Sequence, residues 1–370
     1  MKKLKHITVL PGDGIGPEVI NQAIKVLNAI REKYGNSWEY RFADIGSVAI
    51  DKYHNPFPRE TYEACITSDA ILMGAIGHPK YDHSPSAKIR PEQGLLAMRK
   101  ALKLFSNIRP LRVHPRLAHM SPVKEERLKG VDFVVFRELT GGIYFGEKKK
   151  GKDFASDLCY YSRKEIERVA KLAFKMASSR NKKLTLVDKA NVLESSRLWR
   201  EVVQKLSRSF PEIKTEYLFV DNAAMQLILD PAQFDVILCS NLFGDIISDE
   251  ASVLAGSIGM LPSASRGEVH SLYEPVHGSY HQAAGKDLAN PLATILSAEM
   301  MLRDFGLREQ ADEIQSAVNY CLEEGIGTED LHLDYSCTCS MLGDIIATII
   351  EDGAHTLRWL KIKEGISTII

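Results

Sequence analysis

Short apolar runs rich in β-branched residues alternate with helix-like patterns along this chain. The apolar runs lie at residues 6–10, 70–73, 184–187, 217–220 and 235–239. Patterns with helical spacing lie at residues 17–34 and 195–206. Because strands that alternate with helices are typical of a mostly parallel sheet, the sequence predicts an α/β fold.

The middle of the chain departs from this alternation. Residues 133–137 and 141–146 are predicted to be two strands joined by a glycine bend, since glycines separate two runs rich in β-branched and aromatic residues. Residues 148–152 are lysines and one glycine, and we expect them at the solvated tip of a hairpin.

Length and charge limit the class of ligand. The chain has 370 residues, of which 45% are hydrophobic, and this suits about two domains with buried cores. The 47 basic and 48 acidic residues leave a formal charge of -1. Such a charge offers no field for holding nucleic acid or an acidic membrane, so we expect a small-molecule ligand.

Two further features concern the cell compartment. The segment before Pro11 has too few apolar residues for a secretory signal or a membrane-spanning helix. The six cysteines lack the spacing of a zinc site or a disulfide scaffold. We therefore expect a cytoplasmic protein.

Two aspartates predict a metal site. Asp245 and Asp249 follow an apolar run and stand four residues apart in a helix-like segment. Residues four apart share a helix face, so these carboxylates repel each other unless a cation lies between them. Their oxygens suit Mg²⁺ or Mn²⁺. The alternative is a solvated acidic face, which the apolar neighbours Ile246 and Ile247 make less favourable.

A glycine-rich segment lies between the first predicted strand and helix. Gly12, Gly14 and Gly16 do not have the G-x-G-x-x-G spacing of a dinucleotide-binding fingerprint. Pro17 favours a helix start and the glycines permit a tight turn. A structural turn therefore explains this segment as well as a binding role does.

Three arginines are candidates for binding carboxylates. Arg137 ends an apolar strand, and Arg99 and Arg109 lie upstream of it. A guanidinium presents a fork of donors that matches a carboxylate. The partner could equally be a structural Asp or Glu of the chain itself.

Three more residues are candidates for catalysis. Lys189 follows a predicted strand, where α/β proteins place ligands, and a lysine with a lowered pKa can act as a base. Asp221 also ends a predicted strand and could be a third metal ligand, and Tyr144 could donate a proton. An exposed lysine and a packed aromatic are the structural alternatives for Lys189 and Tyr144.

Six segments in order along the chain resemble the β-decarboxylating dehydrogenases of the isocitrate/isopropylmalate family, most closely its isopropylmalate branch. They lie at residues 10–18, 90–99, 137–146, 187–193, 241–249 and 274–279, so the resemblance spans nearly the whole chain. It implies the oxidative decarboxylation of 3-isopropylmalate to 4-methyl-2-oxopentanoate and CO₂ with reduction of NAD, the third enzymatic stage of leucine biosynthesis.

The resemblance also implies an architecture. It is an α/β fold of two domains with a mixed, mostly parallel sheet, and it is not a Rossmann fold. A discontinuous cofactor-binding domain is expected at residues 1–104 and 257–370. An inserted domain at residues 105–256 is expected to hold substrate and metal and to form a homodimer, whose subunits share each active site.

Roles for individual residues follow from the same resemblance. Asp245 and Asp249 of one subunit and Asp221 of the other are expected to bind Mg²⁺ or Mn²⁺. Lys189 of the neighbouring subunit is the expected base, and Tyr144 is expected to help reprotonate C3. The residues expected to bind substrate are Arg99, Arg109, Arg137, Asp221, Leu95 and Leu96. The residues expected to bind NAD are Gly77, Glu92, Asn191, His277, Gly278, Ser279, Gln282 and Asn290.

The resemblance leaves two alternatives for the function. Leu95 and Leu96 stand where isocitrate-type relatives carry hydroxyl and amide groups, and leucines suit an isopropyl group better than a charge. They separate 3-isopropylmalate only partly from D-malate or tartrate, which remain the alternative substrates. A catalytically silent homologue is an alternative from a different functional class. The chain retains the whole catalytic set, which argues against this alternative.

The cofactor loop departs from the family pattern at one position. Gln282 stands where the family usually has an aspartate that binds the adenosine ribose hydroxyls. The usual repulsion of a 2′-phosphate is therefore missing, but so are the lysine and tyrosine of NADP-dependent relatives. We expect NAD as cofactor, with weaker discrimination against NADP than is usual.

Overall fold

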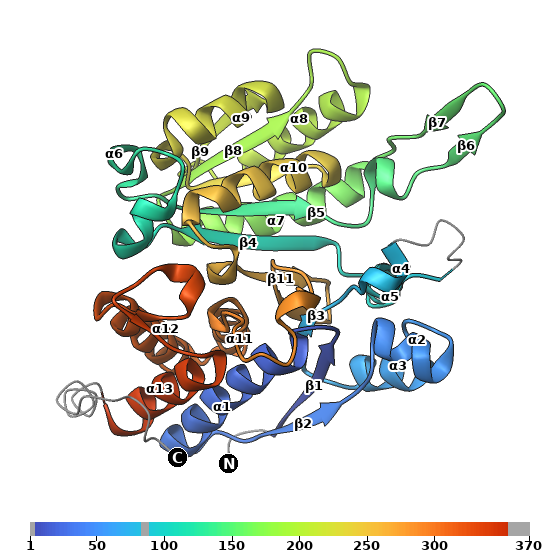
Figure 1. Ribbon diagram of the computed structural model, residues 1–370. Helices are drawn as coiled ribbons and strands as arrows, with labels where there is room; N and C mark the ends of the chain where they lie inside the picture. Colours follow the sequence, from blue (N-terminus) through green and yellow to red (C-terminus); the bar gives the residue numbers. More distant parts are fainter. Residues whose placement is uncertain (1–3, 83–88, 354–370) are drawn as a thin grey trace. The chain divides into compact units, whose positions relative to one another are not determined.

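The computed structural model describes residues 4–82 and 89–353 (Figure 1). Tertiary contacts divide the chain into two compact units. Unit 1 combines the chain up to Met98 with the chain from Leu272 onward, and unit 2 is Arg99–Ser271. Each unit contains its own set of paired strands with helices packed against them.

Unit 1 contains a parallel sheet with the strand order β2-β1-β3-β12. The strands are β1 (Lys5–Gly12), β2 (Trp38–Phe42), β3 (Ala70–Ala75) and β12 (Ser271–Pro275). Every residue of β3 is buried, which is expected of a parallel strand covered on both faces.

Helix α1 (Gly16–Tyr34) packs against the C-terminal helices of unit 1 and ends at Gly35 in the left-handed conformation. The other helices are α2 (Ser47–Tyr53), α3 (Arg59–Ile66), α4 (Pro79–Asp82), α11 (Leu292–Asp304), α12 (Arg308–Glu323) and α13 (Cys339–Asp352). Helix α5 (Pro91–Ala101) spans the boundary with unit 2. A small strand pair, β13 (Ile326–Gly327) and β14 (Tyr335–Ser336), completes the unit.

Unit 2 contains a mixed sheet with the strand order β11-β4-β5-β10-β8-β9. Strand β4 is antiparallel to both of its neighbours, and the remaining pairs are parallel. The strands are β4 (Ser106–Arg112), β5 (Asp132–Glu138), β8 (Lys183–Asp188), β9 (Lys214–Phe219), β10 (Val236–Cys239) and β11 (Pro262–Arg266).

Two pairs of helices accompany this sheet. Helices α7 and α8 pack together, as do α9 and α10, and α7 begins with a capping box between Ser162 and Glu165. The helices are α6 (Glu125–Leu128), α7 (Arg163–Ser179), α8 (Glu194–Ser207), α9 (Val220–Leu229) and α10 (Asn241–Ser252). Within the described residues, no helix is both long and apolar enough to cross a membrane.

Two local expectations from the sequence are wrong. Residues 141–146 do not form a strand, because Gly142–Tyr144 makes a 3₁₀ turn with Gly142 at φ +74°. The buried Glu138 carboxylate causes this turn by accepting the Thr140 and Gly141 backbone N–H groups at 2.8 and 2.7 Å. Asp221 lies in the first turn of α9 and not at a strand end.

A solvated hairpin is confirmed, but Lys148–Lys150 form one of its strands and not its tip. Strands β6 (Lys148–Lys150) and β7 (Ala155–Asp157) pair antiparallel around residues 151–154. All residues of both strands are exposed, as expected for a solvated hairpin.

Candidate active site

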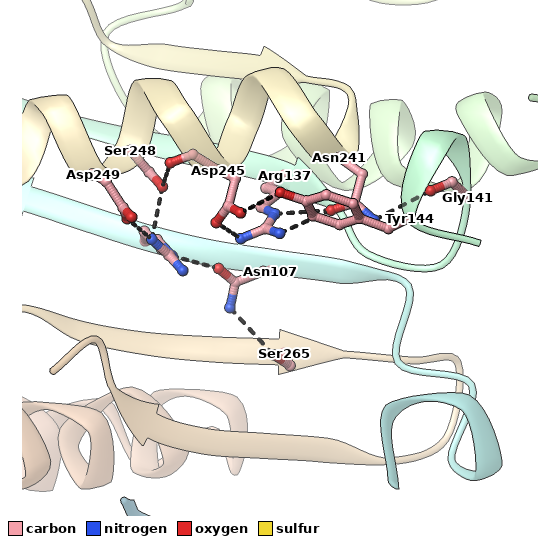
Figure 2. Close-up of polar contacts among 10 residues, drawn as sticks. Asn107, Arg137, Gly141, Tyr144, Asn241, Asp245, Ser248, Asp249 and Ser265 are labelled. Atoms are coloured by element: carbon pink, nitrogen blue, oxygen red, sulfur yellow. Dashed lines mark hydrogen bonds and ion pairs between the residues drawn. The ribbon is translucent and has the colours of Figure 1, made fainter. Parts of the chain in front are cut away.

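Helix α10 presents two carboxylates to the strands beneath it. It follows β10 directly, and Asp245 and Asp249 lie one turn apart on the side that faces β4 and β5 (Figure 2). A glycine permits this close approach, because a Cβ on Gly244 would lie 2.8 Å from the Arg137 Cβ. Residues 241–249 thus contain the start of α10, a glycine that lets the helix approach Arg137 closely, and two acidic side chains.

Arg137, next to the end of β5, is the most buried cation of the site. Its Nη1 donates to Asp245, and its Nε and Nη2 donate to Asn241 Oδ1 at 3.0 and 2.9 Å (Figure 2). The pKa of Arg137 is lowered to about 10, mainly by burial. The negative charge of Asp245 raises this pKa, and the positive charges of Arg109 and Arg99 lower it. Arg137 therefore remains a cation at neutral pH, with the two other predicted arginines close enough to influence it.

Arg109, on β4, forms the second pair with α10. Its Nη1 donates to Asp249 Oδ1 and to Ser248 Oγ, both at 2.7 Å. Its Nε donates to Asn107 Oδ1, also at 2.7 Å. The two aspartates of α10 are thus each bound by a different arginine.

Tyr144 reaches the same carboxylate as Arg137. Its hydroxyl donates to Asp245 Oδ2 at 2.7 Å. Burial raises the pKa of Tyr144, and the hydrogen bond to Asp245 raises it further. The phenol is therefore protonated at neutral pH and can donate a proton. Its turn is held by Asn241, whose Nδ2 donates to the Gly141 carbonyl at 3.2 Å.

Lys189 and Asp221 form a second group within unit 2. Lys189 follows β8, and its Nζ donates to Asp221 Oδ1 at 2.6 Å. This hydrogen bond lowers the pKa of Asp221. Asn191, a predicted cofactor ligand, is exposed two residues beyond Lys189.

The predicted metal ligands are hard oxygen donors and suit Mg²⁺ or Mn²⁺. One chain places Asp245 and Asp249 on a single helix face, and it holds Asp221 on another helix against Lys189. In the part of the chain that the structure describes, no three His, Cys, Asp or Glu residues are grouped closely enough for a metal ion.

Three of the predicted cofactor residues lie together in unit 1. A Cβ added to Gly77 would lie 3.1 Å from Glu92 Oε1 and 3.3 Å from Ser279 Oγ. Gly77 has φ +127°, a conformation that a side chain would strain. Gly77, Glu92 and Ser279 therefore form a tight, polar corner of unit 1 that leaves little room for a side chain at position 77.

The glycine-rich segment supports this corner. The Ile15 N–H donates to the Ser279 carbonyl at 2.9 Å, and a Cβ on Gly14 would lie 1.9 Å from the same oxygen. The Asp13 carboxylate accepts the Gly77 N–H at 3.0 Å. The structural explanation of the segment is therefore sufficient, because it packs against the loops that carry Gly77 and Ser279.

The remaining predicted cofactor residues are more dispersed. Gln282 is exposed in a 3₁₀ turn, and Gly278 has open space beside it. Burial lowers the pKa of His277, so its imidazole is neutral at pH 7. The Asn290 side chain is committed within the protein, since it accepts the Leu292 N–H and donates to Asp330.

The two predicted substrate leucines lie on α5. Leu95 is half-buried and Leu96 is 46% exposed. Leu95 precedes Arg99 by four residues, so both side chains emerge from the same face of that helix.

Sequence reasoning missed the residues that hold the arginines in place. Asn107, Asn241 and Ser248 bind Arg109 or Arg137 directly. A polar residue within or next to an apolar run is the signal that could have identified Asn107 and Asn241. The two-residue spacing of Asn107 and Arg109 could also have indicated that they share a strand face, but nothing in the sequence alone assigns Arg137 to Asn241 or Arg109 to Ser248.

Comparisons with known proteins identify the family. A profile described as isocitrate/isopropylmalate dehydrogenase matches residues 6–346. The 3-isopropylmalate dehydrogenase of Bacillus subtilis (strain 168) is 52% identical over 359 residues, which cover 94% of this chain and 98% of that one. The 3-isopropylmalate dehydrogenase of Aquifex aeolicus (strain VF5) is 50% identical over 360 residues, covering 95% and 98%.

A solved structure supports the fold. The crystal structure of isocitrate dehydrogenase from Methylococcus capsulatus superimposes with a TM-score of 0.82 at 31% identity, covering 94% of this chain and 99% of that one. The predicted fold class is therefore confirmed, including the mixed sheet that distinguishes it from a Rossmann fold. With the profile matching most of the chain, the protein belongs to the isocitrate/isopropylmalate dehydrogenase family.

Proposed function

We propose that this protein catalyses the oxidative decarboxylation of 3-isopropylmalate to 4-methyl-2-oxopentanoate and CO₂, with reduction of NAD and dependence on Mg²⁺ or Mn²⁺. The observation that carries this proposal is the cluster of Arg109, Arg137, Tyr144 and two aspartates on α10, with Arg99 near enough to affect the pKa of Arg137. Relatives of about half-identical sequence that are named 3-isopropylmalate dehydrogenase favour this substrate over D-malate or tartrate. The reaction would serve leucine biosynthesis in the cytoplasm.

Different side chains would perform different parts of the reaction. Arg99, Arg109 and Arg137 would bind the two substrate carboxylates, since guanidinium forks match them geometrically. The metal ion, held by Asp221, Asp245 and Asp249, would lower the pKa of the C2 hydroxyl and stabilise the negative charge that develops during decarboxylation.

Two residues would move the protons. Lys189 would accept the C2 hydroxyl proton while the hydride passes from C2 to NAD. After loss of CO₂, Tyr144, whose raised pKa keeps the phenol protonated at neutral pH, would supply the proton that C3 receives.

We further propose a homodimer in which Lys189 and Asp221 complete the site of the neighbouring subunit. Helices α9 and α10 pack together, and they expose a set of apolar side chains that a second copy could cover. These are Met225, Ile228, Leu229, Ile246 and Val253, which are 40–56% exposed. In this arrangement residues 105–256 provide the metal ligands, the dimer contacts and most substrate contacts. Residues 1–104 with 257–370 provide most of the cofactor site and also Arg99, Leu95 and Leu96 for the substrate.

The proposed reaction has a defined stoichiometry. Purified protein with Mg²⁺, NAD and 3-isopropylmalate is expected to form NADH, CO₂ and 4-methyl-2-oxopentanoate in equal amounts. NADH absorbance at 340 nm and product analysis measure them together. NADH without CO₂ would show oxidation alone and contradict the proposal.

We expect the two leucines of α5 to determine which substrate the enzyme prefers. Burying an isopropyl group contributes about 2 kcal/mol, so 3-isopropylmalate should exceed D-malate in kcat/KM by roughly 30-fold. Isocitrate should be slower still, because leucines cannot pair with its additional carboxylate. Steady-state kinetics with the three substrates measure this ranking. Comparable kcat/KM for 3-isopropylmalate and isocitrate would contradict the role of Leu95 and Leu96.

We expect the enzyme to prefer NAD over NADP, and we expect one substitution to strengthen this preference. Gln282→Asp should raise the NAD:NADP ratio of kcat/KM by about tenfold, since a carboxylate binds ribose hydroxyls and repels a 2′-phosphate. Gln315→Asp, which adds the same charge on α12, is the matched control and should leave the ratio unchanged. A wild-type preference for NADP would overturn the cofactor assignment.

A further inference from the structure

Two buried asparagines hold the two arginines that face α10. Asn107 and Asn241 are each 1% exposed. Asn107 Oδ1 accepts Arg109 Nε, and Asn241 Oδ1 accepts both Nε and Nη2 of Arg137 (Figure 2). In both cases a neutral amide, and not a carboxylate, binds the Nε side of the guanidinium.

Each amide is fixed in orientation by a second hydrogen bond. Asn107 Nδ2 donates to Ser265 Oγ at 3.2 Å, and Asn241 Nδ2 donates to the Gly141 carbonyl at 3.2 Å. An amide has a distinct donor end and acceptor end, so these contacts determine which end meets the arginine. With the Nε side occupied, Nη1 of Arg109 donates to Asp249 and Nη1 of Arg137 donates to Asp245.

The neutral amides of Asn107 and Asn241 add no charge beside the two arginines. Arg109 and Arg137 already contact one carboxylate each, Asp249 and Asp245. An aspartate in place of either asparagine would give its arginine a second carboxylate and make the local charge negative. Like charges placed together in a partly desolvated site repel each other strongly, so an incoming carboxylate would bind more weakly.

We propose that Asn107 and Asn241 are positioning residues that make this site specific for a dianionic substrate. They orient Arg109 and Arg137 without adding a second negative charge to the aspartate that each arginine already contacts, so the two substrate carboxylates meet less repulsion. The inference rests on the proposed function, since it takes the carboxylates of 3-isopropylmalate as the anions.

Asn241 has an additional effect that Asn107 lacks. Its Nδ2 contact with Gly141 supports the turn that carries Tyr144. Aspartate keeps the acceptor for Arg137 but loses this donor. Changes at Asn241 should therefore affect kcat as well as KM, whereas changes at Asn107 should act mainly on KM.

The test compares Asn107→Asp and Asn241→Asp with Asn28→Asp, a matched control on α1 whose Oδ1 accepts the Tyr40 hydroxyl. KM for 3-isopropylmalate is expected to rise by about tenfold or more in both site variants, because a charge has been added beside the arginines. The melting temperature should fall moderately, since each arginine keeps its acceptor but aspartate loses the Nδ2 donor that binds Ser265 or Gly141. Asn28→Asp should keep the wild-type KM.

Alanine variants at both positions distinguish positioning from a purely structural role. Asn107→Ala and Asn241→Ala remove the acceptor, so their melting temperatures should fall below those of the aspartate variants. The inference would be overturned if, across all four variants, KM rose only in proportion to the loss of melting temperature. It would also be overturned if the aspartate variants were active and kept the wild-type KM. No turnover by the wild type would refute the proposed function and this inference with it.

Discussion

Replacing Lys189 by alanine is expected to reduce kcat for 3-isopropylmalate by about 100-fold to 10,000-fold, the usual contribution of a general base. In the structure Lys189 Nζ is 2.6 Å from Asp221, the residue proposed to bind the metal from the same side of the site. Among the residues proposed to bind substrate and metal, none offers a basic nitrogen that could take the C2 hydroxyl proton, because arginine does not deprotonate in proteins. NADH formation at 340 nm measures the loss.

The same variant should remain folded and dimeric. The Asp221 side chain is 65% exposed, so water can replace the ammonium group as its partner when Lys189 is removed. Lys175→Ala, which removes an exposed lysine of α7, is the matched control and should keep wild-type kcat. Substantial turnover by Lys189→Ala would refute its assignment as the base.

The second large effect is expected for Asp245→Asn. An amide is a much weaker ligand for Mg²⁺ or Mn²⁺ than a carboxylate, and even changes to residues that only support metal ligands cost 10-fold to 100-fold in affinity. We expect Mn²⁺ affinity to fall by more than about 100-fold and turnover to be lost. Electron paramagnetic resonance of free Mn²⁺ measures the affinity without requiring activity.

The loss of this carboxylate also affects Arg137. Its side chain is only 7% exposed, and Asp245 is the one acidic group that an ion pair assigns to it among the described residues. The melting temperature should therefore fall, because a buried guanidinium loses its counterion. Glu250→Gln removes one charge from the same helix and is the control. Wild-type Mn²⁺ affinity in Asp245→Asn would contradict the proposed metal site.

The sequence predicts the parts of the site that depend on local spacing. Asp245 and Asp249 stand four residues apart, and the observed α10 places them one turn apart as expected. Lys189 follows a buried run, and the structure puts it directly after β8. These predictions succeed because helix periodicity and strand ends are properties of short segments.

The missed features depend on individual side-chain contacts. The sequence predicts a strand for the turn that carries Tyr144, since Ile143, Tyr144 and Phe145 have β propensity, but the Glu138 carboxylate binds the next backbone N–H groups and the chain turns there. Asn107 and Arg109 lie two residues apart on one face of β4, a spacing that strand periodicity could have indicated. The amide of Asn241 meets Arg137 only once β5 and α10 have packed together, and neither propensity nor spacing contains information about that pairing.

The central claim is that two groups of residues, separate within one chain, combine across a dimer into a site for 3-isopropylmalate. A hybrid dimer of one Lys189→Ala subunit and one Asp245→Asn subunit tests this directly. It can be purified through two different affinity tags and assayed for NADH formation with 3-isopropylmalate, NAD and Mg²⁺. Each parent homodimer should be inactive.

In the hybrid, the intact Asp245 of one subunit would meet the intact Lys189 of the other, which restores one of the two sites. We therefore expect about half of the wild-type activity per dimer. If each subunit formed its own complete site, both sites of the hybrid would be defective, and an inactive hybrid would contradict the account.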